Sequence, residues 1–255
     1  MFPLIQSLTA TPESLEIATE DVIREFHDDG VVYLELRSTP KSTKFMNKSE
    51  YVKTIIKGIQ NCAKKYVIVV TLILSIDRRQ TIEEAEDTLN LALEDDSGLI
   101  VGLELSGNPI LNGVKFIPIL EKARNAGLGV SVHLAEIEEN SDEILDFLRF
   151  KPDRIGHGTF LHTNSEFVRL MEQLKIPLEI CLTSNTLCKT TPTIKDSHLP
   201  FWRSRGIPVA ICASESFGFT FDDLRQISKD SLRISFAARK LDGTIIEKIE
   251  KLIDL

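Results

Sequence analysis

The sequence predicts an α/β protein with the architecture of a (β/α)8 barrel, and three observations lead to this prediction. Short apolar runs rich in Val, Ile and Leu alternate along the chain with longer stretches of helical spacing. These runs are almost continuously apolar, which is typical of strands buried on both faces of a parallel sheet. Polar residues follow most of the runs directly. A barrel carries polar groups at many successive strand ends, whereas a doubly wound sheet concentrates them at one or two turns.

The predicted strands are the seven apolar runs, taken in chain order. Their branched side chains favour extended backbone on a packed surface. The runs are Val31–Leu36, Val67–Ile76, Leu99–Leu105, Leu128–Leu134, Arg154–Leu161, Leu178–Leu182 and Pro208–Cys212. Seven strands are one fewer than the fold uses, and the chain begins with a helical pattern.

The predicted helices lie before and between these strands. The first is the best marked, because Thr11 can cap it, Pro12 suits its first position and Gly30 can end it. The others are Lys48–Lys65, Thr81–Glu94, Gly113–Ala126, Ser141–Phe150, Ser165–Leu174 and Phe221–Lys240. No Pro- or Ser-rich linker divides the chain, so residues 1–255 are predicted to form a single domain.

Composition and charge exclude several classes of partner. The 30 Lys and Arg against 38 Asp and Glu give a net charge of −8, which disfavours nucleic acid and anionic membrane surfaces. No run approaches the roughly 18 apolar residues that can span a bilayer, and the first residues lack a signal pattern. We therefore predict a cytoplasmic location. The four cysteines lack C-x-x-C spacing, so neither a thiolate zinc site nor a disulfide framework is predicted.

Two histidines and one carboxylate stand at the ends of two successive predicted strands. His133 and Glu136 close the fourth strand, and His157 follows in the fifth. Adjacent strand ends converge in a barrel, so the three side chains are expected to share a small volume. They can supply a nitrogen ligand for zinc, an acid that exchanges protons with substrate, and an imidazole that orients water. Either His157 or Glu136 alone is better explained as structural, but the two together favour a functional site.

Five segments resemble, in order and spacing, the motifs of the adenosine and AMP deaminase family. The first two are most similar to its adenosine deaminase-like branch, the N6-methyl-AMP deaminases. The segments are Tyr33–Pro40, Leu103–Pro109, His133–Glu136, Arg154–Thr159 and Leu182–Asn185. The resemblance extends from Met1 to about Cys212 and resumes near the end of the chain. It implies a barrel of the metal-dependent hydrolase type.

The resemblance implies a zinc hydrolase that removes the amino or methylamino group from carbon 6 of a purine monophosphate and leaves IMP. By position, His133 would bind the single zinc ion, Glu136 would protonate the purine ring, and His157 would orient the attacking hydroxide. Glu136 must be protonated for this role. We therefore expect a desolvated setting that raises its pKa.

The resemblance also implies where the nucleotide binds. The phosphate would lie at the turn formed by Ser38, Thr39, Pro40 and Lys41. This turn offers hydroxyls, backbone N–H groups and a cation, all of which suit a monophosphate. Taken alone, Lys41 could equally be a solvated surface residue. Asp77 and Gly107 match positions that touch the nucleotide.

Three further residues receive a structural interpretation, and a fourth is expected beside the site. Arg78 and Arg79 are interpreted as surface or ion-pair residues, and Trp202 as a packing residue. His198 lies where the family often carries a histidine at the edge of the site.

The sequence departs from the family at two points. The family's first strand carries an H-x-H pair that supplies two zinc ligands, and this chain contains no H-x-H. After Ile211–Cys212 the family has a Thr-Asp-Asp turn, but this chain reads Ala213–Thr220, which resembles the end of a later helix. We therefore expect a truncated or spliced form that lacks strand 1 and part of the last βα unit. It would keep His133 alone among the family's zinc ligands, bind almost no zinc and turn over no N6-methyl-AMP.

Other functions stay open from the sequence. One is an adenosine deaminase that acts on the nucleoside, and another is a non-catalytic nucleotide-binding or interaction protein. A further metal-dependent barrel hydrolase is less favoured, and a zinc deaminase of the cytidine type is excluded because its Pro-Cys-x-x-Cys motif is absent. The expected partner is a small purine nucleotide, and the chain is expected to be a monomer.

Overall fold

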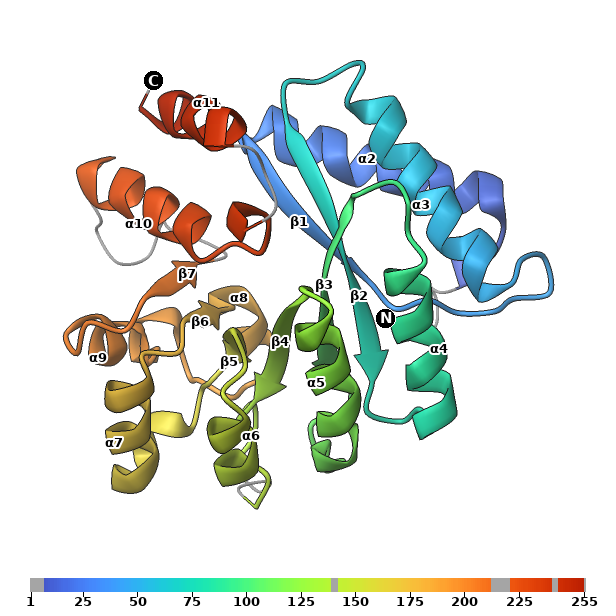
Figure 1. Cartoon of the computed structure of the whole chain (residues 1–255). Helices are drawn as coiled ribbons and strands as arrows, with labels where there is room; N and C mark the ends of the chain where they lie inside the picture. The colour runs from blue at the N-terminus through green and yellow to red at the C-terminus, as the bar shows by residue number, and fades with distance from the viewer. Residues whose placement is uncertain (1–6, 139–141, 212–220, 240–242, 255) are drawn as a thin grey trace.

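Seven parallel strands form one sheet in the computed structural model, which describes residues 7–138, 142–211, 221–239 and 243–254. Their order in the sheet is their order in the chain (Figure 1). The strands are β1 (Tyr33–Ser38), β2 (Val69–Asp77), β3 (Ile100–Ser106), β4 (Gly129–Leu134), β5 (Arg154–His157), β6 (Leu178–Ile180) and β7 (Val209–Ile211). Each lies within or overlaps one of the seven predicted strands, so the predicted α/β fold is confirmed.

The sheet is a half-barrel with β1 and β7 at its two edges. Pairing of backbone groups runs without a break from β1 to β7, and no pairing among the described residues joins the two edge strands. Because all strands run in the same direction, their carboxyl ends lie along one rim. This rim receives the residues that the sequence placed after the strands.

The helices begin and end largely as their capping residues predict. They are α2 (Pro12–Asp28), α3 (Lys48–Cys62), α4 (Ile82–Leu93), α5 (Ile117–Asn125), α6 (Ile144–Phe150), α7 (Ser165–Leu174), α8 (Leu182–Leu187), α9 (Leu199–Arg203), α10 (Phe221–Arg233) and α11 (Gly243–Ile253), with short 3-10 turns at Val114–Phe116, Leu161–Thr163, Ile194–Asp196 and Ala237–Arg239. Thr11 caps α2, because its hydroxyl accepts the Ser14 N–H at 3.2 Å. Three helices were not predicted: α8, α9 and α11.

Two predicted strands end earlier than the apolar pattern suggests. The strand predicted at Arg154–Leu161 ends at His157, since His157 and Gly158 have φ angles of 63° and 60° and turn the chain away from the sheet. The strand predicted at Leu178–Leu182 ends at Ile180, and Leu182 begins α8 instead. In both places the apolar run continues into the turn that carries site residues. Apolar character therefore marks burial here rather than strand length.

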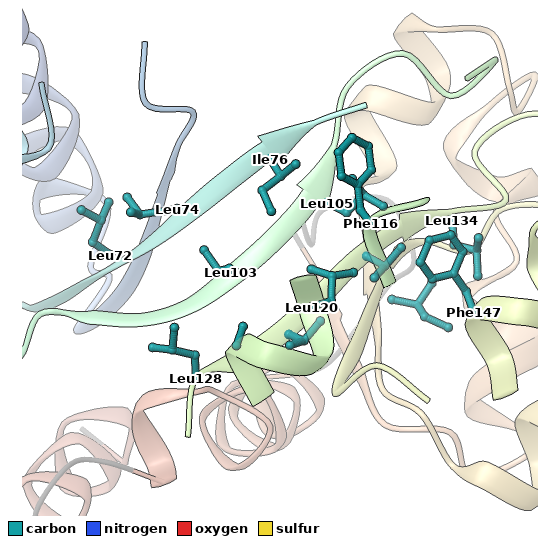
Figure 2. Close-up of a cluster of buried hydrophobic side chains, with 14 of the residues drawn as sticks. Leu72, Leu74, Ile76, Leu103, Leu105, Phe116, Leu120, Leu128, Leu134 and Phe147 are labelled. Carbon is teal, nitrogen blue, oxygen red and sulfur yellow. The ribbon is translucent and has the colours of Figure 1, made fainter. Parts of the chain in front are cut away.

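The hydrophobic core lies between the outer face of the sheet and its helices. Leu72, Leu74 and Ile76 alternate along β2 and are fully buried. Figure 2 shows them beside Leu103 and Leu105 of β3, and shows Phe116 and Leu120 on the helical side. Alternate residues of a strand point to opposite faces, so the positions between these leucines face the barrel interior. Ser75 is such a position, Thr71 lies on the same face of the strand, and both make polar contacts there.

Phe236 closes the interior at the end opposite the carboxyl rim. Its ring is buried, and the Arg154 guanidinium lies 3.6 Å from the ring centroid. Its backbone N–H donates to Glu35 Oε1 at 2.6 Å. The segment after α10 thus shields the charged groups of the interior from solvent.

Among the described residues, no helix combines the length and apolar character needed to cross a bilayer.

Candidate active site

A network of buried charges fills the barrel interior just below the carboxyl rim. Arg37 forms ion pairs with Glu104 and with Glu179, the latter at 2.5 Å. Arg154 forms ion pairs with Glu179 at 2.7 Å and with Glu35 at 2.6 Å. Burial alone would raise the pKa of Glu179, but the charges of Arg37 and Arg154 lower it to about 2. Every carboxylate in the network therefore has a cation beside it, which offsets the cost of removing it from water.

His133 stands above this network at the end of β4. Its Nε2 lies 3.5 Å from both Glu104 Oε2 and Arg37 Nη1. The ring packs closely against Gly156 of β5, where an added Cβ would lie 2.5 Å from His133 Cδ2. Burial disfavours the charged imidazole, but Glu104 and Glu136 raise the pKa of His133 to about 10. In the absence of a competing ion, the side chain is therefore an imidazolium near neutral pH.

Glu136 lies between two histidines. The turn that carries it passes through Ala135, whose φ of 52° is in the left-handed region that non-glycine residues rarely adopt. Glu136 Oε1 lies 3.5 Å from His133 Nδ1, and Oε2 lies 3.6 Å from His157 Nε2. The carboxylate thus faces an imidazole nitrogen with each oxygen.

The pKa of Glu136 shifts in the direction opposite to the expected one. Burial would raise it, as the sequence argument required. The hydrogen bond from His133 and the electrostatic interactions with His157, His133 and Arg78 outweigh burial, and the pKa falls below its usual value. The expectation was wrong because it considered desolvation without the cations around the carboxylate.

His157 is held on both sides by residues of neighbouring segments. Its Nδ1 lies 3.1 Å from Oδ1 of Asn185, a buried residue of α8. Its carbonyl accepts a hydrogen bond from His198 Nε2 at 2.8 Å. Because an amide oxygen only accepts, the Nδ1 of His157 carries the proton, and the lone pair of Nε2 faces Glu136. Burial lowers the pKa of His157, which keeps this imidazole neutral.

The donors at this site fit a divalent metal ion. One ligand atom each from His133, Glu136 and His157 lies within 4.8 Å of the others. Two imidazoles and one carboxylate are a donor set that zinc hydrolases use. The sequence assigned only His133 as a ligand, and the structure places two further donors beside it. The segment Ala213–Thr220, where the family's aspartate turn was sought, lies outside the described residues.

The predicted phosphate turn follows β1 on the same rim. Ser38 Oγ lies 3.0 Å from the hydroxyl of Tyr51, a buried residue of α3. Lys41 Nζ donates to Thr9 Oγ1 at 3.4 Å and lies 5.9 Å from the centre of the Tyr51 ring. Between them, Thr39 is half-buried and Pro40 is buried. The hydroxyl of Tyr51 is a neighbour of this turn that the sequence argument missed.

The structure brings the other two predicted nucleotide-binding residues into contact. Gly107 has a φ of 106°, and a Cβ there would lie 2.8 Å from the carboxylate of Asp77. Asp77 accepts two hydrogen bonds from the Arg79 side chain, at 2.8 and 2.6 Å. Arg79 is exposed and Arg78 is buried, and both form ion pairs. Their interpretation as ion-pair residues is confirmed, but Arg78 is not a surface residue.

Several site residues escaped notice because they lie inside apolar runs. Glu104 and Glu179 each stand between two apolar residues of a strand. A lone charge in such a run points to the interior of a barrel and needs a partner, since unpaired charges are seldom buried. That pattern could have identified both glutamates, whereas nothing in the sequence indicates that they share Arg37.

Comparisons with known proteins agree on one family. The adenosine deaminase family matches residues 1–215. A protein of Caenorhabditis elegans named adenosine deaminase-like protein is 38% identical over 273 residues, covering 98% of this chain and 70% of its own length. The N6-methyl-AMP deaminase of Bos taurus is 42% identical over 276 residues, covering 97% of this chain and 79% of its own. The crystal structure of Arabidopsis ADAL complexed with IMP has a TM-score of 0.90 at 31% identity, covering 99% of this chain and 80% of that one.

Proposed function

The chain belongs to the adenosine deaminase family of hydrolytic deaminases, and from this premise we propose that it removes the 6-amino or 6-methylamino group of a purine nucleoside monophosphate. One observation carries the proposal. Glu136 faces His133 with one oxygen and His157 with the other, at 3.5 and 3.6 Å. A carboxyl group beside a neutral imidazole can move protons between water and a ring nitrogen, as purine deamination requires.

We propose N6-methyl-AMP as the substrate and IMP as the product. Relatives from Bos taurus and Homo sapiens, 42% and 38% identical to this chain, carry the name N6-methyl-AMP deaminase. Structures of the Arabidopsis relative are complexes with IMP and with GMP. The turn with Ser38 and Lys41 lies on the same rim as His133 and offers hydroxyls and an ammonium to a phosphate. A nucleoside would leave these groups unused, so we favour the monophosphate.

We propose zinc as the metal of this site. His133 would hold it, and Glu136 and His157, whose donor atoms lie within 4.8 Å of that of His133, would stand beside it as the proton-transferring groups. When bound, zinc would act as a Lewis acid that activates the attacking water. The ion must first displace the proton from His133, whose pKa is raised to about 10. From the sequence we expected almost no bound zinc and no turnover, because His133 is the one family zinc ligand retained. We still expect little zinc to survive purification, but because Glu136 and His157 stand beside His133, we propose that turnover occurs when zinc is supplied.

The protein's own side chains would handle the protons. His157 Nε2, held toward Glu136 by Asn185, takes a proton from water and shares it with the Glu136 carboxylate. Glu136 then delivers it to the purine ring nitrogen as hydroxide adds to carbon 6. The carbon–nitrogen bond breaks, and the amine leaves with the second proton of the water. The carboxylate that Glu136 forms in the free protein is thus the starting state of the cycle.

Product analysis tests this proposal. The full chain, supplied with zinc, is incubated in turn with N6-methyl-AMP, AMP and adenosine, and IMP, inosine and released amine are quantified. We expect IMP and methylamine from N6-methyl-AMP and a slower reaction with adenosine. Inosine as the faster product would identify an adenosine deaminase. Binding of the monophosphate with no product from any substrate would identify a non-catalytic nucleotide-binding protein.

A further inference from the structure

Arg78 is a buried cation that joins three segments around the candidate site. It follows β2 directly, and its side chain is 1% exposed. Its Nη1 donates to the Leu111 carbonyl at 2.6 Å and to Glu143 Oε2 at 2.7 Å. Its Nη2 donates to the carbonyl of His133 at 2.8 Å. One guanidinium therefore holds the loop after β3, the end of β4 and the N-terminal end of α6.

Glu143, which follows Glu136 in the chain, is the carboxylate that pairs with Arg78. Its side chain is 2% exposed, and Oε2 also accepts the Gly113 N–H at 2.7 Å. A Cβ on Gly113 would lie 2.8 Å from Arg78 Nη1, so the loop fits closely around the guanidinium. Arg78 and Glu143 thus fix the backbone at His133, three residues before Glu136, and at Gly113 in the loop after β3.

The burial of this ion pair is not explained by stability alone. Two buried charges lose their free energy of hydration, and their mutual attraction barely offsets that loss. A buried pair is therefore weak evidence of stabilisation. Helix α6 also carries an exposed ion pair, Arg149 with Asp146 at 3.5 Å, which stays hydrated. Arg78 and Glu143 also line one small cavity together with His133 and Glu136. The positive charge of Arg78 additionally contributes to the lowered pKa of Glu136.

We infer that Arg78 is a positioning residue of the deaminase site, which sets the places of His133 and Glu136 through the His133 carbonyl and the Glu143 carboxylate. The inference rests on the proposed function, but it concerns the geometry of two side chains and can be judged without turnover. In this inference Arg78 acts on its neighbours and not on the substrate. It acts through the backbone at the end of β4 and through the loop that Glu143 fixes.

Two conservative variants of the full chain test the inference. Arg78→Lys keeps the charge, but a compact ammonium cannot reproduce the rigid fork that serves three acceptors. Glu143→Gln keeps the shape and removes the negative charge. Arg149→Gln is the matched control, because it breaks an exposed ion pair on the same helix. The chain has only five histidines, so long-range 1H–15N spectra can follow each imidazole, with His27 on α2 as the internal reference.

We expect both test variants to shift the His133 resonances while those of His27 stay in place, and the control to shift neither. With zinc and N6-methyl-AMP, we expect kcat to fall by about tenfold to a hundredfold, the cost of a small misplacement, with little change in KM. Unshifted His133 resonances in either folded variant would overturn the inference. If Arg78→Lys does not fold, Glu143→Gln alone decides. If the wild-type chain shows no turnover, the proposed function fails and the resonances still decide on Arg78.

Discussion

The amide oxygen of Asn185 lies 3.1 Å from Nδ1 of His157 and so determines which nitrogen of that imidazole faces Glu136. Asn185 comes from α8, a helix that begins where the sequence predicted the end of a strand. The early end of β6 therefore brings the amide to the side of His157. The proton transfer proposed for His157 depends on this contact, because only the unprotonated Nε2 can accept a proton.

Asn185→Ala should impair turnover more than binding. Without the amide, the imidazole of His157 loses its fixed tautomer and orientation, and we expect kcat to fall by about tenfold to a hundredfold. The KM for N6-methyl-AMP should change little. Steady-state kinetics on the zinc-supplied chain measure both constants. Asn90→Ala, on the exposed surface of α4, serves as the matched control, and equal kinetics for the two variants would contradict the role of Asn185.

Glu179→Gln should destabilise the fold strongly. The change removes the negative charge that Arg37 and Arg154 share at 2.5 and 2.7 Å. Breaking a buried pair by removing one partner costs about 3–5 kcal/mol. Urea denaturation of wild type and variant measures the difference in the free energy of unfolding. The exposed pair of Lys122 and Glu86 gives the control, since Lys122→Gln should cost at most about 1 kcal/mol. A cost that small for Glu179→Gln would show that the network does not support the half-barrel.

Stability should fall as the pH drops below about 6.5, and His198 should contribute to this fall. Burial lowers the pKa of His198 from 6.5 to about 4, so the folded protein holds the neutral imidazole. A lowered pKa in the folded state means that unfolding takes up a proton between these values. The contribution is therefore fully present above pH 6.5 and is lost as pH falls through 4. It amounts to roughly 3 kcal/mol.

Urea denaturation at a series of pH values between 4 and 7 measures this effect. The His198→Gln variant should show a smaller loss of the free energy of unfolding across the same range than the wild type. An unchanged slope in the variant would assign the acid sensitivity to other groups.

The sequence predicted the fold well because its signals are local. Seven apolar runs produce seven strands, and capping residues such as Thr11 mark where helices begin. The sequence also placed His133 and His157 on successive strands, and register brings Leu134 opposite His157 in the sheet. The fold alone therefore sets these two imidazoles close together, with ring centroids 5.0 Å apart.

The electrostatics of the site could not be predicted in the same way. Whether the pKa of Glu136 rises or falls depends on His133 of β4, His157 of β5 and Arg78 just after β2, which only the folded chain brings together. The burial of Arg78 depends on Glu143, 65 residues further along the chain. Such long-range contacts have no signature in a local pattern, so the expectation for the protonation of Glu136 was wrong although the sequence placed Glu136 beside His133 and His157.

Turnover by wild type and Glu136→Gln, each supplied with zinc and assayed for bound metal, tests the central claim most directly. The claim is that Glu136, between His133 and His157, is the proton-transferring group of a purine nucleotide deaminase. We predict that the wild type releases IMP from N6-methyl-AMP. We also predict that Glu136→Gln loses about a hundredfold or more of this activity at equal zinc content. Undiminished IMP release by the variant, or no release by a zinc-loaded wild type, would contradict the claim. Loss of zinc together with activity would instead make Glu136 a metal ligand.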